Sequence, residues 1–278
     1  MVNFSEYREG ILQGLESLRG SPLFSDEYLS FRISVFKAQF YAYERLASRG
    51  LKIENLPVKQ DDLSIDGQIS GGLIEQISFS SNVATRQKLG MIAAFSESNP
   101  GCLEEIIKAA CFGPDQKKLE DLSEKIGIGA DFLSFAGRVS GAPFISSLIK
   151  GYEGETPEFP VDSGCPYCGS DPGLAILRGK EGLRFLSCSL CGMEWKFARM
   201  SCPFCGSGKS LGNLKENASA EWIETCDECG CYIKTVSAKD APVENGINPL
   251  VEAVRLFHLD LIAVKKGYVE CLPYVAIR

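Results

Sequence analysis

Histidine is almost absent from this sequence, since the 278 residues include only His258. A single imidazole excludes zinc fingers that use two cysteines and two histidines, and most triad chemistry that relies on a second imidazole. We expect His258 to pack against or cap its predicted helix. The phosphate-binding patterns G-x-x-x-x-G-K-[ST] and G-x-G-x-x-G are also missing. With no convincing catalytic constellation in the sequence, we expect a protein that is not an enzyme.

Long apolar runs and an excess of positive charge are lacking as well. No continuous apolar run approaches the ~18 residues that a membrane helix needs, so we expect no membrane insertion. The N-terminus carries Glu6 and Glu9 where a secretory signal would be basic, which favours a cytoplasmic protein. The net charge of -7 and the pI near 5.0 make nucleic-acid binding unlikely, because an acidic chain repels phosphate.

Cysteine is abundant and clustered. Nine of the twelve cysteines fall between residues 165 and 231, and such clustering in a reducing compartment favours metal binding over disulfides. They form four C-x-x-C pairs, in which 19 residues separate the first two pairs, 20 the last two and ten the middle two. The spacing therefore predicts two tandem modules of the form C-x2-C-x19–20-C-x2-C. Their predicted metal ligands are Cys165, Cys168, Cys188 and Cys191 in the first module and Cys202, Cys205, Cys226 and Cys229 in the second.

Each module has the chemistry of a tetrahedral four-sulfur site. Two thiolates three positions apart can bind one ion from a tight turn, and the glycine after each pair allows that turn without a Cβ clash. Two such turns complete a four-cysteine site for zinc or for a single iron, and the spacing does not choose between the metals. We expect Cys102, Cys111 and Cys271 to be core residues, and Cys231 to be a residue on the other strand face.

The periodicity of apolar residues divides the chain into four parts. Residues 1–150 are predicted to form an α-helical domain, and residues 151–164 a linker rich in proline, glycine and acids. The first four-cysteine module covers residues 165–200. The second covers residues 201–278 and ends in a helix. The predicted fold class is thus α+β and multidomain.

Several local patterns predict individual helices, loops and strands within these parts. Ser25 should cap a helix over residues 26–46, and Asn99-Pro100 should begin another. Gly141-Ala-Pro143 should break a helix over residues 131–149, and residues 52–72 should be a long loop. Strands are expected at GLRFLS, MEWKFAR, EWIET and CYIKTVS. A closing helix from Asn248 to Gly267 should bury one apolar stripe made of Leu250, Ala253, Val254, Phe257, Leu261 and Val264.

The run CSLCGMEWKFARMSCPFCG, the later CDECGCYIK and the closing helix resemble the formate dehydrogenase accessory protein family, FdhE. The resemblance is specific from residue 165 to about 235, and the helical half agrees in layout and length. The residues that carry it are Cys188, Ser189, Leu190, Cys191, Glu194, Trp195, Arg199, Cys202, Cys205, Cys226, Asp227, Cys229, Tyr232 and Lys234, followed by Asp260, Leu261, Gly267 and Tyr268.

This resemblance implies a helical N-terminal domain followed by two rubredoxin-like, or zinc-ribbon-like, four-cysteine metal modules. It implies a cytoplasmic, non-catalytic assembly factor that binds the catalytic subunit of a respiratory formate dehydrogenase, with two metal ions per chain, iron favoured and zinc possible. The modules would be rigid platforms, or their iron would support redox work on that subunit. Candidate partner contacts, of types enriched at interface anchors, are Arg178, Arg184, Trp195, Arg199 and Tyr232.

Two other functions fit the same cysteine pattern. Duplicated zinc ribbons often bind nucleic acid, although the acidic charge counts against this. A rubredoxin-like electron carrier would need the same four-cysteine sites, but it would not need the large helical half. The sequence leaves the oligomeric state open between a monomer and a homodimer.

Overall fold

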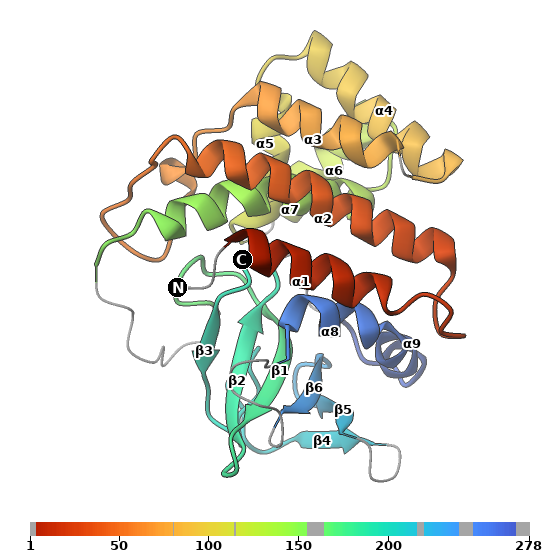
Figure 1. Ribbon diagram of the computed structural model, residues 1–278, viewed down its shortest axis with the longest axis vertical. Helices are drawn as coiled ribbons and strands as arrows, with labels where there is room; N and C mark the ends of the chain where they lie inside the picture. Colours follow the sequence, from red (N-terminus) through yellow and green to blue (C-terminus); the bar gives the residue numbers. More distant parts are fainter. Residues whose placement is uncertain are drawn as a thin grey trace. The chain divides into compact units, whose positions relative to one another are not determined.

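The computed structural model describes residues 4–79, 81–113, 115–154, 164–215, 220–238 and 247–270. The chain divides into two compact units, residues 1–155 and residues 156–276. In the described part of the chain the first unit is built of helices, and the second holds a sheet with two further helices (Figure 1). Much of the predicted linker, residues 155–163, lies outside the described residues.

The helical unit follows the predicted periodicity in its first long helix. Its helices are α1 (Phe4–Glu16), α2 (Asp26–Ala47), α3 (Gly67–Phe79), α4 (Val83–Ser98), α5 (Cys102–Cys111), α6 (Gln116–Ile126) and α7 (Ala130–Lys150), with a short 3-10 turn, η1 (Gln60–Asp62). The Ser25 side chain caps α2 by accepting a hydrogen bond from the backbone N–H of Tyr28 at 3.1 Å. One face of α2 is apolar and buried, made of Leu29, Ile33, Phe36, Phe40 and Tyr43.

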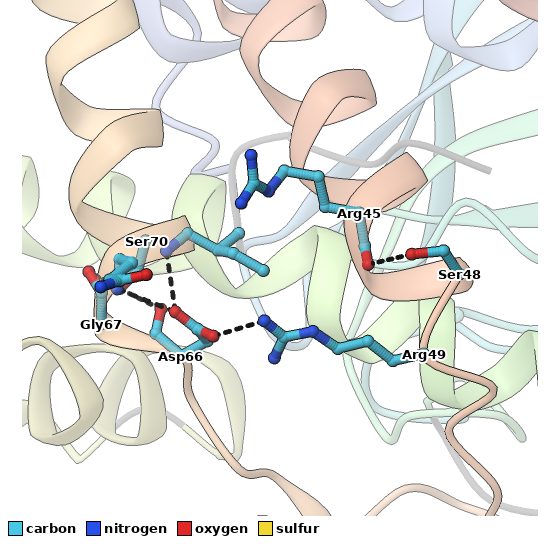
Figure 2. A network of polar contacts seen from close by, with 8 residues as sticks. Arg45, Ser48, Arg49, Asp66, Gly67 and Ser70 are labelled. Carbon is cyan, nitrogen blue, oxygen red and sulfur yellow. Dashed lines mark hydrogen bonds and ion pairs between the residues drawn. The ribbon is translucent and has the colours of Figure 1, made fainter.

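The prediction of a loop over residues 52–72 was wrong at its end, because α3 begins at Gly67. Asp66 starts this helix: its Oδ1 atom accepts hydrogen bonds from the backbone N–H groups of Gln68 and Ile69, at 2.8 and 3.0 Å. Its other carboxylate oxygen pairs with Arg49, just beyond the end of α2, at 2.6 Å (Figure 2). A capping carboxylate therefore overrides a loop signal that rested on glycine and serine content.

The predicted break at residues 141–143 was also wrong, because α7 runs unbroken through Pro143. A proline removes the N–H that would bond to the carbonyl four residues earlier, here that of Val139. The Gln39 side-chain amide of α2 donates to that carbonyl at 2.9 Å, in the buried interior. A neighbouring helix thus replaces the bond that the proline removes.

Helix α7 is the centre of the helical unit. Added Cβ atoms on Gly137 and Gly141 would lie 2.7 Å from Ala110 Cβ and 2.6 Å from Cys111 Sγ, so these glycines allow α5 to pack closely. Although α7 is not a continuous apolar run, its length and average composition alone would allow it to cross a membrane. However, 78% of its most apolar window is buried within the protein, as in a core helix.

The start of α5 differs from its prediction. The helix begins at Cys102, and Gly101, with φ of +89°, occupies the N-cap position instead of Asn99. Asn99 instead ends α4, where its side chain donates to the carbonyl of Phe95 at 2.8 Å. Cys102 and Cys111 are both buried, as predicted.

The second unit contains one six-stranded sheet. Its strands are β1 (Pro172–Arg178), β2 (Leu183–Cys188), β3 (Glu194–Lys196), β4 (Leu211–Leu214), β5 (Glu221–Cys226) and β6 (Tyr232–Ala238), in the order β3-β2-β1-β6-β5-β4. The four predicted strands are β2, β3, β5 and β6. Each module contributes an antiparallel three-stranded half, and the halves join through the parallel pair of β1 and β6.

Two short helices, α8 (Pro249–Arg255) and α9 (Phe257–Lys265), pack against this sheet (Figure 1). The prediction of one continuous helix with one buried stripe was wrong, since the helix is interrupted at Leu256. The interruption turns α9, so that Leu259 and Ala263 face the interior while Leu261 and Val264 are 60% and 61% exposed.

We predict that Gln39→Leu destabilises the helical unit by about 1–3 kcal/mol, because it leaves the buried Val139 carbonyl without its donor. The free energy of unfolding in urea, followed by circular dichroism, measures the loss. Gln13→Leu on the exposed face of α1 is the control and should change stability by less than about 0.5 kcal/mol. Equal effects of the two substitutions would contradict the proposed role of Gln39.

We predict that Asp66→Ala costs about 1 kcal/mol near pH 7 through loss of the cap on α3. Hydrogen bonds from the Ile69 N–H and from Arg49 lower the pKa of Asp66 in the folded protein. The ionised carboxylate therefore stabilises the fold fully above the pKa that Asp66 has in the unfolded chain. This stabilisation is lost as the pH falls through the pKa of Asp66 in the folded protein. The stability difference between the variant and the parent should therefore shrink below about pH 4. Urea unfolding at several pH values tests this, with Asp61→Ala on the exposed η1 turn as the control. A difference that does not depend on pH would contradict it.

Candidate metal centres

The four C-x-x-C turns close with one shared backbone pattern. In each, the first cysteine's N–H donates to the carbonyl five residues later, and the glycine N–H donates back to the first cysteine's carbonyl. These eight hydrogen bonds measure 2.7 to 3.2 Å. The glycines Gly169, Gly192, Gly206 and Gly230 have φ between +72° and +75°. This left-handed backbone conformation favours glycine, which confirms why one follows every pair.

The turns bring the eight predicted ligands together in two groups of four. Within each group the ligand sulfur atoms all lie within 4.8 Å of one another. In the first group Cys165 and Cys191 are 3.6 Å apart, and Cys168 and Cys188 are 3.5 Å apart. In the second, both closest pairs, Cys202 with Cys229 and Cys205 with Cys226, are 3.7 Å apart.

These separations test whether a metal ion fits. A tetrahedral ion with ~2.3 Å metal–sulfur bonds places its ligands about 3.8 Å apart, close to the observed spacing, whereas a disulfide needs about 2.05 Å. Both groups therefore have the donor set and the separation of a four-cysteine metal site. The identity of the ion does not follow from this geometry.

The electrostatics of the first group are also compatible with a bound cation. Burial, followed by hydrogen bonds with Cys168 and Cys188, raises the pKa of the Cys165 thiol. Burial also opposes ionisation of Cys188, but hydrogen bonds from neighbouring thiols and the Cys191 N–H lower the pKa of Cys188. A buried group of four thiols does not readily hold four negative charges alone. A bound metal cation would stabilise them.

Both four-cysteine groups lie at the same end of the six-stranded sheet. Strands β1, β3, β4 and β6 all run in one direction, since β1 pairs in parallel with β6 and every other pair is antiparallel. In each module the first cysteine turn precedes the first strand, and the second turn joins the second strand to the third. All four turns therefore lie where these parallel strands begin.

Comparison with known proteins agrees with this arrangement. Residues 164–199 match the family model described as FdhE, central domain. The chain is 35% identical over 114 residues to a protein FdhE homolog of Stutzerimonas stutzeri, and 32% identical over 152 residues to one of Pseudomonas aeruginosa. These alignments cover 39% and 51% of this chain, but only 36% and 47% of the two relatives.

A solved structure of another protein has a similar fold over nearly the whole chain. The crystal structure of the FdhE protein from Pseudomonas aeruginosa aligns with a TM-score of 0.63 and 20% identity, over 97% of this chain and 93% of that one. The chain therefore resembles FdhE proteins, in sequence over its cysteine modules and in fold over nearly its whole length. The resemblance carried by the cysteine modules is thereby confirmed, as is the α+β fold class.

The residues that this family resemblance offered as partner contacts lie mostly inside the sheet unit. Arg184, Trp195 and Tyr232 are 2%, 6% and 3% exposed, so partner contact would require them to leave the interior. Arg184 donates to two carbonyls in the connection between the modules and pairs with Glu224 of β5 at 2.6 Å. It therefore joins the first module to the second.

The other two predicted contacts lie nearer the surface. Arg178 is half-buried and pairs with Glu194 at 2.8 Å, and Arg199 is exposed. Both belong to the first four-cysteine module, the part of the chain that matches the FdhE central-domain model. Of the five, they are the pair that the folded surface presents, and their contact with a partner stays a prediction.

A buried polar cluster between β6 and the helices α8 and α9 was not predicted. The Asp260 carboxylate of α9 accepts hydrogen bonds from the Lys234 ammonium at 2.6 Å and the Tyr232 hydroxyl at 2.8 Å, both from β6. Lys234 also donates to the Ala253 carbonyl of α8 at 3.2 Å. Burial, and then the charge of Asp260, raise the pKa of Tyr232. The cluster attaches the closing helices to β6. The sequence held one indication of it, because Tyr232, Lys234 and Asp260 are all among the residues that carry the family resemblance.

The two remaining candidates do not belong to either site. His258 lies outside both cysteine groups, and its Nδ1 atom is 3.3 Å from the carbonyl of Arg255. Cys231 is buried and disulfide-bonded, and it is not a member of either group.

We predict that Cys188→Ser reduces the bound metal from two ions per chain to one, because it removes a ligand from the first site. It should also lower the free energy of unfolding by about 3 kcal/mol or more. Native mass spectrometry of anaerobically purified protein counts the ions. Cys102→Ser, a buried cysteine outside both groups, should keep two. Retention of two ions by Cys188→Ser would contradict the assignment of this ligand.

Proposed function

We propose that this protein is an assembly factor for a respiratory formate dehydrogenase and that it binds the catalytic subunit of that enzyme in the cytoplasm. The observation that carries the proposal is the pair of four-cysteine groups within a chain that resembles FdhE proteins. The formate dehydrogenase role comes from the family resemblance. The geometry of the cysteine groups supports metal-dependent maturation, because it provides two ordered ion sites on one sheet.

The ligand geometry favours an accessory role over catalysis by the metal. Catalytic metal sites keep a coordination position open for water or substrate, whereas four cysteines complete a tetrahedral shell. The eight cysteines would hold two ions, and we propose iron as the resident metal. Iron bound to four thiolates can take up and release one electron, while zinc in the same shell would serve only to hold the fold.

Metal content and a visible spectrum of the anaerobically purified chain test the iron proposal. Two irons per chain with thiolate-to-iron charge-transfer bands are expected. Two zincs would overturn the iron assignment and leave the modules as platforms. They would also favour the nucleic-acid alternative, which a gel shift at low salt would then test.

We propose that Arg199, and beside it Arg178, contribute to the surface that meets the catalytic subunit. Arg199→Glu should weaken binding of the purified subunit by about tenfold, since the change replaces an attractive charge with a repulsive one. Biolayer interferometry with immobilised catalytic subunit measures this. Lys209→Glu, an exposed charge reversal in the second module, is the matched control and should bind like the parent. Absence of binding by the parent chain would refute the partner, and equal affinities of parent and Arg199→Glu would refute the surface.

A further inference from the structure

The two four-cysteine groups differ in how far solvent reaches them. All four cysteines of the first group are buried, between 0% and 3% exposed. In the second group Cys202 and Cys226 are buried, but Cys229 is half-buried and Cys205 is exposed. Cys205 and Cys168 occupy equivalent positions in the repeat, as the second cysteine of the first turn. The same ligand position is therefore enclosed in one copy and open in the other.

Side chains account for part of this difference, because the backbone of the equivalent turns is the same. The residue after Cys188 is Ser189 and the residue after Cys226 is Asp227, and both donate their backbone N–H to a carbonyl, at 3.0 and 2.9 Å. The Ser189 hydroxyl turns inward and donates to the same carbonyl at 2.7 Å. The Asp227 carboxylate is exposed and accepts from the Tyr268 hydroxyl at 2.6 Å.

The next position in each turn repeats this difference. Leu190 is fully buried beneath the first group, whereas Glu228 at the equivalent position is exposed. In the other turn of each group, Tyr167 is 8% exposed and its counterpart Phe204 is half-buried. At three equivalent positions a buried side chain of the first group's turns is thus replaced by a more exposed one in the second group. Two of these replacements, Asp227 and Glu228, are acidic.

The place of each module in the sheet contributes to the contrast. The turn that holds Cys168 leads into β1, an inner strand of seven residues with five buried. The turn that holds Cys205 leads into β4, an edge strand of four residues, none of which is buried. An edge strand covers its neighbouring turn from one side only. The opening at Cys205 therefore follows from the order of the strands as well as from the side chains.

We propose that the two sites have different roles: the first is a permanent structural site, and the second is an exchange site at which an external thiolate or chelator replaces Cys205. This inference rests on the part of the proposed function in which both groups hold metal, and not on the identity of the partner. The exchange is a ligand substitution without electron transfer. An external donor takes the position that the Cys205 sulfur leaves, and the released thiolate accepts a proton from water.

The exposed carboxylates of Asp227 and Glu228 favour the same assignment. Two negative charges beside an open group of thiolates raise the local concentration of cations and so assist loading from solution. Ser189 and Leu190 bring no charge to the first group. Grafting them onto the second group, as the double variant Asp227→Ser with Glu228→Leu, should therefore slow loading there, and the less exposed side chains should also slow release.

The test is the time course of zinc release from the zinc-loaded full chain into an excess of a chromogenic chelator. We expect two phases of equal amplitude, one ion each, with rates at least about tenfold apart. Cys205→Ser should remove the fast phase and keep the slow one. Its matched variant, Cys168→Ser, should remove the slow phase. The graft of Ser189 and Leu190 should slow the fast phase about threefold or more.

A second measurement does not depend on any variant folding. During chelation of the parent chain, alkylation read by mass spectrometry should label Cys205 before any cysteine of the first group. Release of both ions in one phase, or first labelling of the first group, would overturn the exchange assignment while leaving the proposed function intact. A chain that binds neither zinc nor iron would overturn both.

Discussion

The close approach of four cysteine sulfurs, all within 4.8 Å of one another in each group, is the constraint on which the sheet unit depends. Ligands of each group come from both ends of a hairpin, so an ion bound to all four would fasten the strands where they begin. Strands β3 and β4 have three and four residues, too few to stabilise a sheet by hydrogen bonds alone. Structural zinc contributes about 10–16 kcal/mol of binding energy to small folds of this type, more than such strands supply.

The parallel pairing of β1 with β6 turns two small modules into one body. Without it each module would be a three-stranded sheet with two open edges. The pairing places the third strand of the second copy against the first strand of the first copy, so the copies follow one another along the sheet. The buried Arg184, which joins β2 to Glu224 of β5, strengthens this union. Because β1, β3, β4 and β6 run in the same direction, both four-cysteine groups lie at one end of the sheet.

How much of this could be predicted from sequence depended on whether the signal was local. The cysteine spacing and the trailing glycines predicted the ligand set of both groups, because each turn is closed by bonds within six residues. The continuity of α7 could not be predicted in this way, because the donor that compensates for Pro143 is Gln39, 100 residues from the carbonyl it bonds. The wrong burial of Leu261 and Val264 had a similar cause. A single interruption at Leu256 turned the helix relative to its apolar stripe.

The comparison of Ser189 with Asp227 shows how a repeated sequence can give two different sites. The backbone bond made by each residue is the same, and the geometry of each cysteine turn depends on such bonds. The side chains at this position can differ, because the shared backbone bond does not involve them. Glycines and cysteines therefore stay in register between the copies, while the residues between them decide whether a site is enclosed. A fold stabilised by one enclosed site can tolerate exposure at the other.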